Sequence, residues 1–118
     1  MTARILIVDD EPDVRYMMRV ILESAGHEVT EARHGTAGLM SVKAAPPDLV
    51  ITDVMMPTMN GVEFIERLRS DPNYAGIPIL VVSGNSELAT AADARISKPF
   101  LALELLTAAA LLIREAGG

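Results

Sequence analysis

The sequence predicts an α/β fold in which helices cover both faces of a mostly parallel sheet. Residues 5–8, 49–51 and 79–82 form short runs that are apolar at every position and rich in β-branched side chains, as in strands buried on both faces. Stretches with the spacing of amphipathic helices separate these runs. Strands that alternate with helices are joined by right-handed crossovers, so neighbouring strands run parallel.

The first predicted helix has clear signals at both ends. Apolar residues recur at helical spacing from Val14 to Ala25, with Pro12 near the start and Gly26 just past the end. Proline suits the first helical turn because the N–H that it lacks would be unpaired there anyway, and glycine suits the residue that follows a helix. These signals predict a helix directly after the first strand.

The remaining elements continue the alternation. Helices are predicted over 35–45, 61–70 and 101–115, and a Pro-Pro pair follows the first of these three. The segments Glu28 to Ala32 and Arg95 to Ser97 have weaker strand patterns, which are typical of edge strands. The prediction is therefore a doubly wound sheet of five strands.

Composition excludes several classes of protein. The 118 residues suit a single domain, 1–118, and half of them are apolar. A net charge of −6 with only ten Lys and Arg disfavours direct nucleic-acid binding. The chain has no cysteine, its N-terminal apolar run is too short for a signal peptide, and its longest apolar segment, 100–113, is too short to span a membrane. We expect a cytoplasmic protein with no membrane segment and no output domain.

Polar side chains stand at the ends of four predicted strands. Asp9 and Asp10 follow the first strand, Asp53 the third, Ser83 the fourth and Lys98 the fifth. Ligands of such sheets bind beyond the carboxyl ends of the strands, where the direction of winding reverses. We therefore expect three carboxylates, a hydroxyl and an ammonium group to meet at this edge.

These groups favour phosphoryl chemistry on a magnesium ion. Three neighbouring carboxylates repel one another unless a cation lies among them, and oxygen ligands without Cys or His favour Mg²⁺. His27 and His34 lie far from the acidic residues in the sequence and are interpreted as surface residues. A carboxylate can itself be the nucleophile, and Asp53 is the best placed one. Ser83 and Lys98 could each donate to a phosphoryl oxygen.

Four short segments carry a resemblance to a known family. They read Val-Asp-Asp-Glu-Pro at 8–12, Thr-Asp-Val-Met-Met-Pro at 52–57, Asn-Gly at 60–61 and Lys-Pro-Phe at 98–100. Together they resemble the signature of response regulator receiver domains of two-component signalling, the chemotaxis receivers among them, across almost the whole chain. The resemblance implies a flavodoxin-like parallel sheet with the strand order 2-1-3-4-5.

The resemblance also implies how the metal would be held. Asp9 and Asp10 would be the acidic pair that binds Mg²⁺, together with Asp53 and the backbone carbonyl of Met55. Asp53 would be the phosphoacceptor. Met55, with its thioether, is a poor side-chain ligand for a hard cation, so only its carbonyl enters this set.

For the phosphoryl group, the resemblance implies two further residues. Ser83 would be the switch hydroxyl and Lys98 the lysine that binds the phosphoryl group, with a cis peptide bond between Lys98 and Pro99. Arg95 departs from the family pattern, because receivers usually have there a Tyr or Phe that moves inward on activation. An arginine is not easily buried without a partner, so we expect Arg95 at the surface beside an acidic group.

The connection between the fourth and fifth strands is a second departure. Lys98 follows Ser83 by only fifteen positions, several fewer than in most receivers. A parallel crossover normally needs about a dozen residues or more, and 84–94 supplies eleven. We therefore expect the fourth helix of the fold to be shortened or missing, with one or two turns around 86–92 at most.

The last predicted helix carries more apolar surface than one face of a sheet can bury. One stripe consists of Leu101, Leu105, Ala108 and Leu112, and a second of Leu103, Leu106, Ala110 and Ile113. Either an alanine-rich helix packs deeply, or the second stripe is an interface. Our hypothesis is a homodimer, or kinase docking, through this helix and the shortened region beside it.

Three functions fit these residues to different degrees. The first is a phosphoacceptor that receives a phosphoryl group from a sensor histidine kinase or a histidine phosphotransfer protein, and turns over no external substrate, so it is not an enzyme in that sense. The second, a Mg²⁺-dependent phosphatase, is disfavoured because the Asp-x-Asp pattern after the first strand is absent. The third is a pseudo-receiver adaptor that acts without phosphorylation, which Arg95 leaves open. Flavin binding is disfavoured because the loop 9–13 is acidic and would repel a phosphate.

Overall fold

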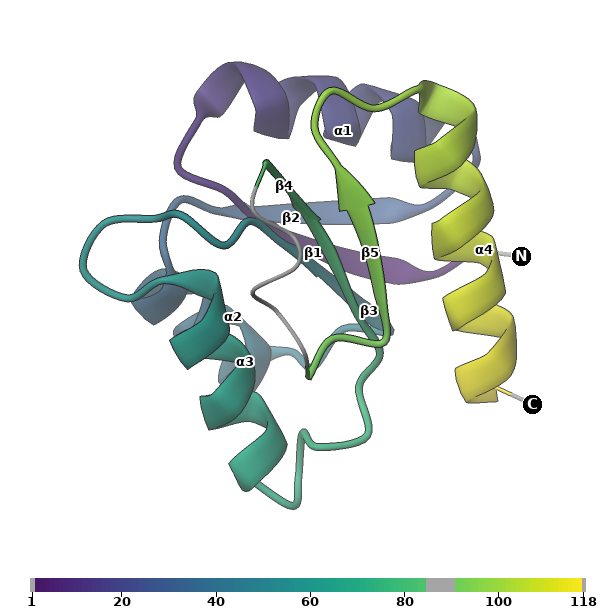
Figure 1. Ribbon diagram of the computed structural model, residues 1–118. Helices are drawn as coiled ribbons and strands as arrows, with labels where there is room; N and C mark the ends of the chain where they lie inside the picture. The colour runs from purple at the N-terminus through teal and green to yellow at the C-terminus, as the bar shows by residue number, and fades with distance from the viewer. Residues whose placement is uncertain (1, 85–90, 118) are drawn as a thin grey trace.

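The described part of the chain is a five-stranded parallel sheet between two pairs of helices (Figure 1). The computed structural model describes residues 2–84 and 91–117. The strands are β1 Arg4–Val8, β2 Glu28–Ala32, β3 Leu49–Thr52, β4 Ile79–Ser83 and β5 Ala94–Ser97. The helices in the described residues are α1 Pro12–Ser24, α2 Gly35–Ala44, α3 Gly61–Ser70 and α4 Ala102–Gly117. Each predicted strand and helix in these residues is confirmed, with ends shifted by at most two residues.

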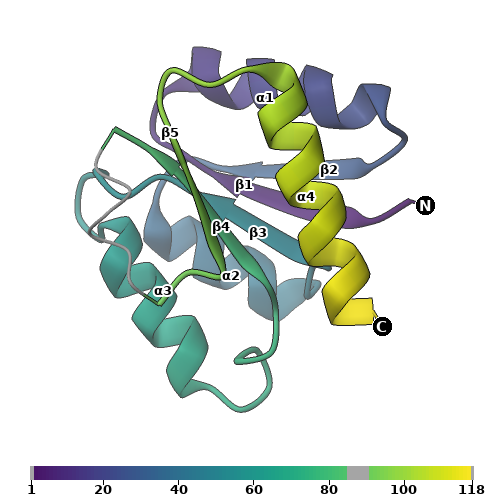
Figure 2. The same ribbon diagram turned by 45° about the vertical axis from the view of Figure 1, so that its right-hand side comes forward.

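The strand order β2-β1-β3-β4-β5 confirms the doubly wound topology that the resemblance implied. Helices α1 and α4 cover one face of the sheet, and α2 and α3 cover the other (Figure 1 and Figure 2). The chain passes from β1 outward to β2 and then returns across β1 to β3, so the winding reverses between β1 and β3. Val8 is level with Thr52 in the parallel register. The residues that follow these two strands, Asp9 and Asp53, therefore emerge side by side.

Two apolar cores hold the layers together. Side chains of a central strand alternate between the faces, so Ile5 and Ile7 lie in one core while Leu6 and Val8 lie in the other. The α1 and α4 side of the sheet packs on Met18, Leu22, Leu105, Ala109 and Leu112. The α2 and α3 side packs on Val42, Phe64, Ile65 and Leu68. Because both faces of the central strands are covered, their sequences are apolar throughout.

Polar side chains cap two of the helices. The Asn60 side chain accepts a hydrogen bond from the Glu63 N–H at 2.9 Å and so caps α3. His34 caps α2, since its Nδ1 accepts from the Ala37 N–H at 3.1 Å. The other histidine, His27, is also structural, because its Nδ1 accepts from the Ala3 N–H at 3.2 Å. Both histidines are half-buried, which corrects their interpretation as plain surface residues.

The short connection between β4 and β5 is held by an arginine of α3. Gly84 begins a turn, and 91–93 form a turn and bend that lead into β5; most of the predicted turns around 86–92 lie outside the described residues. The Arg69 guanidinium donates to the Ala91 carbonyl at 3.3 Å and forms an ion pair with Asp93 at 2.6 Å. Asp93 also accepts from the Ile79 N–H at 2.7 Å. Arg69 therefore ties the connection to both α3 and β4.

Helix α4 buries one stripe and leaves other leucines in solvent. Of the first predicted stripe, Leu105 and Leu112 are buried, but Leu101, which lies just before the helix, is 70% exposed. Leu103 of the second stripe and Leu111 are 72% and 46% exposed. The prediction that one sheet face cannot bury all the apolar side chains of this helix is thus confirmed. Within residues 2–84 and 91–117, no helix combines the length and apolar character that a bilayer crossing needs.

Candidate functional site

The two buried carboxylates at the end of the sheet lie in fixed orientations. Asp9 and Asp53 are 0% and 5% exposed. Asp9 Oδ1 accepts a hydrogen bond from the Glu11 N–H at 2.9 Å, and Asp53 Oδ1 accepts from the Val54 N–H at 2.7 Å. A backbone N–H thus bonds one oxygen of each carboxylate: the N–H two residues further along for Asp9, and the next N–H for Asp53. The second oxygen of each carboxylate is not bonded by the backbone and faces Lys98.

Lys98 joins these two free oxygens. Its Nζ donates to Asp9 Oδ2 at 2.9 Å and to Asp53 Oδ2 at 3.2 Å. It follows β5, and the peptide bond between Lys98 and Pro99 is cis, as the resemblance implied. Burial lowers the proton affinity of this amine, but its hydrogen bonds and its attraction to Asp9 and Asp53 outweigh burial and raise the pKa of Lys98. The amine is therefore a permanent positive charge at the phosphoacceptor candidate.

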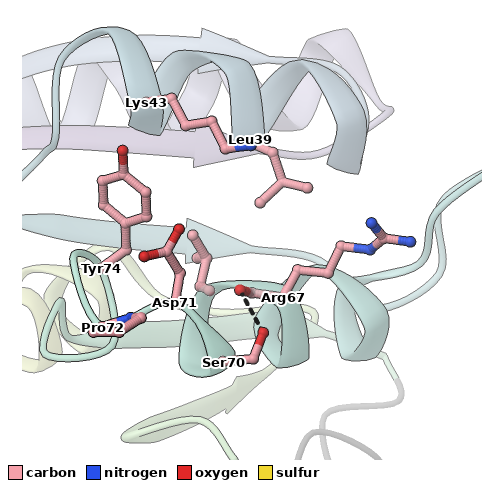
Figure 3. Close-up of a pocket in the computed structure, with 8 residues that line it drawn as sticks. Leu39, Lys43, Arg67, Ser70, Asp71, Pro72 and Tyr74 are labelled. Atoms are coloured by element: carbon pink, nitrogen blue, oxygen red, sulfur yellow. Dashed lines mark hydrogen bonds between the residues drawn. The ribbon is translucent and has the colours of Figure 1, made fainter.

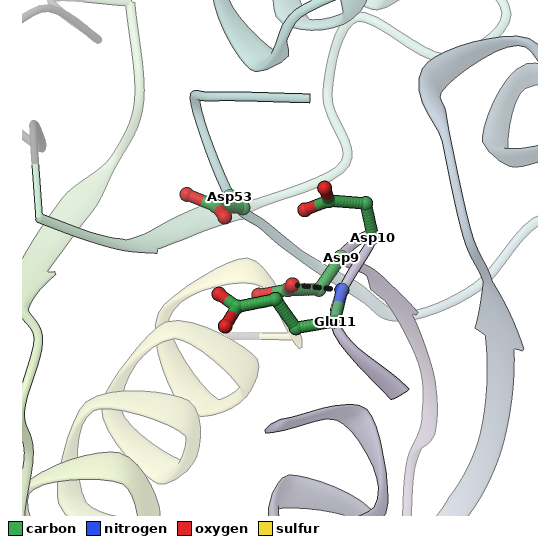
Figure 4. Close-up of side chains that lie close together, drawn as sticks. All are labelled: Asp9, Asp10, Glu11 and Asp53. Carbon is green, nitrogen blue, oxygen red and sulfur yellow. Dashed lines mark hydrogen bonds between the residues drawn. The ribbon is translucent and has the colours of Figure 1, made fainter. Parts of the chain in front are cut away.

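Two exposed carboxylates complete the cluster. Asp10 and Glu11 each place an oxygen within 4.8 Å of oxygens of Asp9 and Asp53, and Figure 4 shows the four side chains gathered between the loop after β1 and the end of β3. Burial raises the pKa of Asp9, and the hydrogen bonds from the Glu11 N–H and from Lys98 offset only part of this effect. An added cation would favour its ionised form. The set consists of oxygen donors alone, which suits Mg²⁺.

The loop after Asp53 folds back tightly under the start of α3. The Gly61 N–H donates to the Val54 carbonyl at 2.7 Å, and a Cβ at Gly61 would overlap the Asp53 carbonyl oxygen and lie 2.8 Å from Val54 Cα. Only glycine allows this approach. Met55 lies in the same loop with its side chain 59% exposed, away from the core. The predicted use of its carbonyl as a metal ligand stays a prediction.

Ser83 lies where the sequence placed it, beside Lys98. It is 1% exposed at the end of β4, level with Ser97, and its carbonyl accepts from the Lys98 N–H at 3.1 Å. Arg95 is exposed, as expected, but it forms no ion pair with an acidic group in the described residues. The structure thus brings Asp9, Asp53, Ser83 and Lys98 to one end of the sheet.

Sequence reasoning missed one contact of the cluster. Glu11 Oε1 accepts a third hydrogen bond from Lys98 Nζ, at 3.2 Å. The signal was its position directly after the acidic pair, but a glutamate before a helix is more often a solvated first-turn charge. Only the fold shows that its side chain turns toward Lys98.

A groove of about 460 Å³ lies elsewhere, between the C-terminal ends of α2 and α3 (Figure 3). It is lined by Leu39, Lys43, Arg67, Leu68, Ser70, Asp71, Pro72 and Tyr74. The acidic cluster stands at the opposite end of α3, where that helix begins. The groove therefore contributes no side chain to the cluster.

Comparison with known families shows which family the chain belongs to. The family model described as "Response regulator receiver domain" matches residues 5–110. The chain is a member of the receiver domain family. The match includes the loop after β1, the end of β3 and Lys98, which are the segments that build the acidic cluster.

Relatives of this receiver are response regulators. The phosphate regulon transcriptional regulatory protein PhoB of Pseudomonas aeruginosa is 36% identical over 96% of this chain and 52% of its own length. Protein PilH of the same organism is 38% identical over 69% of this chain and 67% of its own. The chain spans about half the length of PhoB and of the DNA-binding response regulator MtrA of Mycolicibacterium smegmatis, 52% and 48% respectively.

Solved structures give the same family. The chemotaxis response regulator CheY4 of Vibrio cholerae superposes with a TM-score of 0.87 at 31% identity, covering 95% of this chain and 99% of that one. A putative response regulator from Chloroflexus aurantiacus gives a TM-score of 0.90 at 30% identity, covering 97% and 99%. The receiver fold therefore holds despite the short connection between β4 and β5.

Proposed function

We propose that this receiver accepts a phosphoryl group on Asp53 in a Mg²⁺-dependent reaction and signals through protein contacts. The observation that carries the proposal is the position of Lys98 Nζ between Asp9 Oδ2 and Asp53 Oδ2, at 2.9 and 3.2 Å. Asp53 therefore lies beside the positive charge of Lys98 and among the other carboxylates of the acidic cluster. Phosphoryl transfer depends mostly on such positioning and charge neutralisation.

The proposed reaction is a transfer between two residues of different proteins. A carboxylate oxygen of Asp53 attacks the phosphorus of a phosphohistidine, the P–N bond breaks, and the imidazole leaves with the bonding pair and takes up a proton. Water later cleaves the acyl phosphate, which restores Asp53 and releases inorganic phosphate. The chain turns over no external substrate, so the proposal is a switch and not an enzyme.

Each neighbouring residue has a role in the proposal. Lys98 neutralises one phosphoryl oxygen, and the Ser83 hydroxyl donates to another, since charge-assisted hydrogen bonds are stronger than neutral ones. Asp9, Asp10, Asp53 and the Met55 carbonyl would hold Mg²⁺. The ion, when bound, would neutralise negative charge on the phosphoryl oxygens.

The proposed partner is a sensor histidine kinase or a histidine phosphotransfer protein, since receivers interact with such proteins. The relative MtrA is a DNA-binding response regulator, and DNA binding is not assigned to this chain. Its net charge of −6 also disfavours direct contact with phosphates. We propose that the phosphoryl transfer takes place in the cytoplasm.

Mass spectrometry of the intact protein tests the proposal. The chain is incubated with a small phosphodonor such as acetyl phosphate and Mg²⁺, and we expect one added phosphoryl group. Asp53→Asn is the matched control and should gain none, because the amide is a poor nucleophile of nearly the same shape. Absence of the adduct on the parent chain, or its presence on Asp53→Asn, would contradict the assignment.

A pseudo-receiver adaptor is the second candidate, and Arg95 favours it. The exposed arginine stands where receivers usually carry an aromatic switch residue, so phosphorylation could not be relayed in that way. If the adaptor function is correct, Asp53→Asn will bind the partner protein as tightly as the parent chain does, with and without phosphodonor. A phosphorylation-dependent difference in affinity would exclude it.

The homodimer through α4 also remains a proposal. Leu101 and Leu103 are exposed near the start of the helix. Light scattering at high protein concentration, with and without phosphodonor, decides the point. A monomeric mass in both conditions would remove the dimer.

A further inference from the structure

Arg15 of α1 holds the backbone of the acidic loop that follows β1. Its Nη1 donates to the Asp9 carbonyl oxygen at 2.6 Å, and its Nε forms an ion pair with Glu31 Oε1 at 3.0 Å. The Arg15 side chain is only 16% exposed. The planar guanidinium thus connects the edge strand β2 to the peptide between Asp9 and Asp10.

Asp10 depends on this peptide for its position. Within residues 2–84 and 91–117, its carboxylate accepts no hydrogen bond and forms no ion pair, yet it belongs to the four-carboxylate cluster. Asp9, by contrast, is fixed through Glu11 and Lys98. Since no side-chain partner holds the Asp10 carboxylate in the described residues, its place depends on where its own backbone puts it, and the carbonyl of the preceding peptide is bonded to Arg15.

We propose that Arg15 is a positioning residue for cation binding: through the Asp9 carbonyl it keeps the Asp10 carboxylate aimed into the acidic cluster. The inference rests on the proposed function, because it assumes that the cluster binds Mg²⁺. Arg15 touches neither the ion nor the phosphoryl group. Its effect passes through one hydrogen bond to the backbone.

The sign of the effect separates positioning from electrostatics. Removing a positive charge next to an acidic cluster should strengthen the attraction for a divalent cation. Loss of a group that orients a metal ligand should weaken binding, by about tenfold when typical outer-sphere partners are removed. An Arg15 variant that loses affinity for Mg²⁺ therefore cannot be explained by its charge.

Arg19 offers a matched control on the same helix. It also forms an ion pair with Glu31, at 2.5 Å, and it contacts Glu23 and the Val29 carbonyl. It has no contact with the acidic loop in the part of the chain that the structure describes. Arg15→Gln and Arg19→Gln thus change the net charge equally and disturb the same glutamate, but only the first removes the bond to Asp9.

The experiment measures Mg²⁺ binding to the unphosphorylated chain by calorimetric titration. We expect Arg15→Gln to weaken binding about tenfold and Arg19→Gln to change it less than about twofold. Unchanged or tighter binding in Arg15→Gln would overturn the proposal, as would equal losses in both variants. If Arg15→Gln does not fold, Arg15→Lys replaces it: one ammonium cannot reproduce the two-directional fork, so a loss of affinity is again expected and parent-like affinity overturns the proposal.

A second readout needs no metal. The Glu11 N–H, which donates to Asp9 Oδ1, should exchange with solvent faster in metal-free Arg15→Gln than in the parent chain or Arg19→Gln. A parent chain that binds no Mg²⁺ would overturn the proposed function and the metal-binding part of this inference. Equal Glu11 exchange in all three proteins would instead overturn the claim that Arg15 holds the loop.

Discussion

Single residues in this receiver act on the site through the backbone as much as through their side chains. Gly61 lets α3 begin directly against the Asp53 carbonyl, and Arg15 bonds the Asp9 carbonyl. Asp9 and Asp53 then present one oxygen each to Lys98, because the other oxygen is bonded to a backbone N–H. The geometry of the acidic cluster is therefore also set by residues outside it.

Substitution of Gly61 should be severe. We expect Gly61→Ala to destabilise the fold by about 3 kcal/mol or more, because the added methyl overlaps backbone atoms of Asp53 and Val54 that cannot move without displacing β3. Urea unfolding measures the change. Gly76→Ala is the control: a Cβ there meets nothing within 4 Å, so its stability should stay within about 0.5 kcal/mol. Similar stability of the two variants would show that the loop relaxes freely.

Glu31 should make stability depend on pH in a defined direction. Burial opposes its charge, but its hydrogen bonds with Arg19 and Arg15 outweigh burial and lower the pKa of Glu31 below 4.5. Since the folded state favours the ionised form, the stabilisation is present at neutral pH and is lost as pH falls from about 4.5 through the folded pKa.

The measurement compares Glu31→Gln with the parent chain. The variant should be less stable by about 1 kcal/mol at pH 7, because two partly buried ion pairs are lost. The difference should vanish in acid, below the folded pKa. Glu28→Gln on the same strand serves as control, since Glu28 has no side-chain ion pair in the described residues. A difference that persists in acid would contradict the assignment to charge.

At the scale of elements, the short connection between β4 and β5 is supported from α3. Arg69 donates to the carbonyls of Ala75, Ile77 and Ala91 and pairs with Asp93. The same guanidinium therefore holds the loop that leads into β4 and the segment that leads into β5. Receivers usually have a longer helix in this connection. Here, hydrogen bonds from Arg69 hold residues 91–93, the end of the connection that leads into β5.

We expect Arg69→Met to destabilise the fold by about 2 kcal/mol, because several carbonyls and Asp93 lose a charged donor. Arg67→Met is the matched control: among residues 2–84 and 91–117, Arg67 pairs only with Glu63, with side chains 58% and 47% exposed, so its loss should change stability by less than about 0.5 kcal/mol. Thermal and urea unfolding of both variants give the comparison. Equal effects would mean that Arg69 contributes no more than a surface charge.

At the scale of the whole molecule, the sheet concentrates negative charge at one end. Four carboxylates share a space that Lys98 alone bridges among the described residues. Burial raises the pKa of Asp9 in that space, and a bound cation would favour its ionised form. Metal binding and folding should therefore be coupled.

We expect Mg²⁺ at a hundred times its dissociation constant to stabilise the metal-free chain by about 2.7 kcal/mol, and chelation to reverse the gain. Unfolding curves at matched ionic strength measure it. Asp10→Asn should lose most of the gain without much change in metal-free stability, because Asp10 is exposed and unpaired in the described residues. An equal response of Asp10→Asn and the parent chain would place the ion elsewhere.

The sequence by itself determined the layered fold and the members of the cluster. Fully apolar strands can only lie between two layers of helices. Parallel strands bring Asp9, Asp53, Ser83 and Lys98 to one edge of the sheet, whatever the exact positions of the helices. The strand order and the cis bond before Pro99 came from the family resemblance, because periodicity says which segments are strands but not which strands are neighbours.

Tertiary structure alone decided which contacts orient these groups. Glu11 reaching Lys98, Arg15 holding the Asp9 carbonyl and Arg69 tying the β4 to β5 connection are pairings between distant or ordinary surface residue types. Helical periodicity marks such charges as solvated, and nothing in their spacing names a partner. Their directions follow from how α1 and α3 dock on the sheet, which depends on packing across the whole chain.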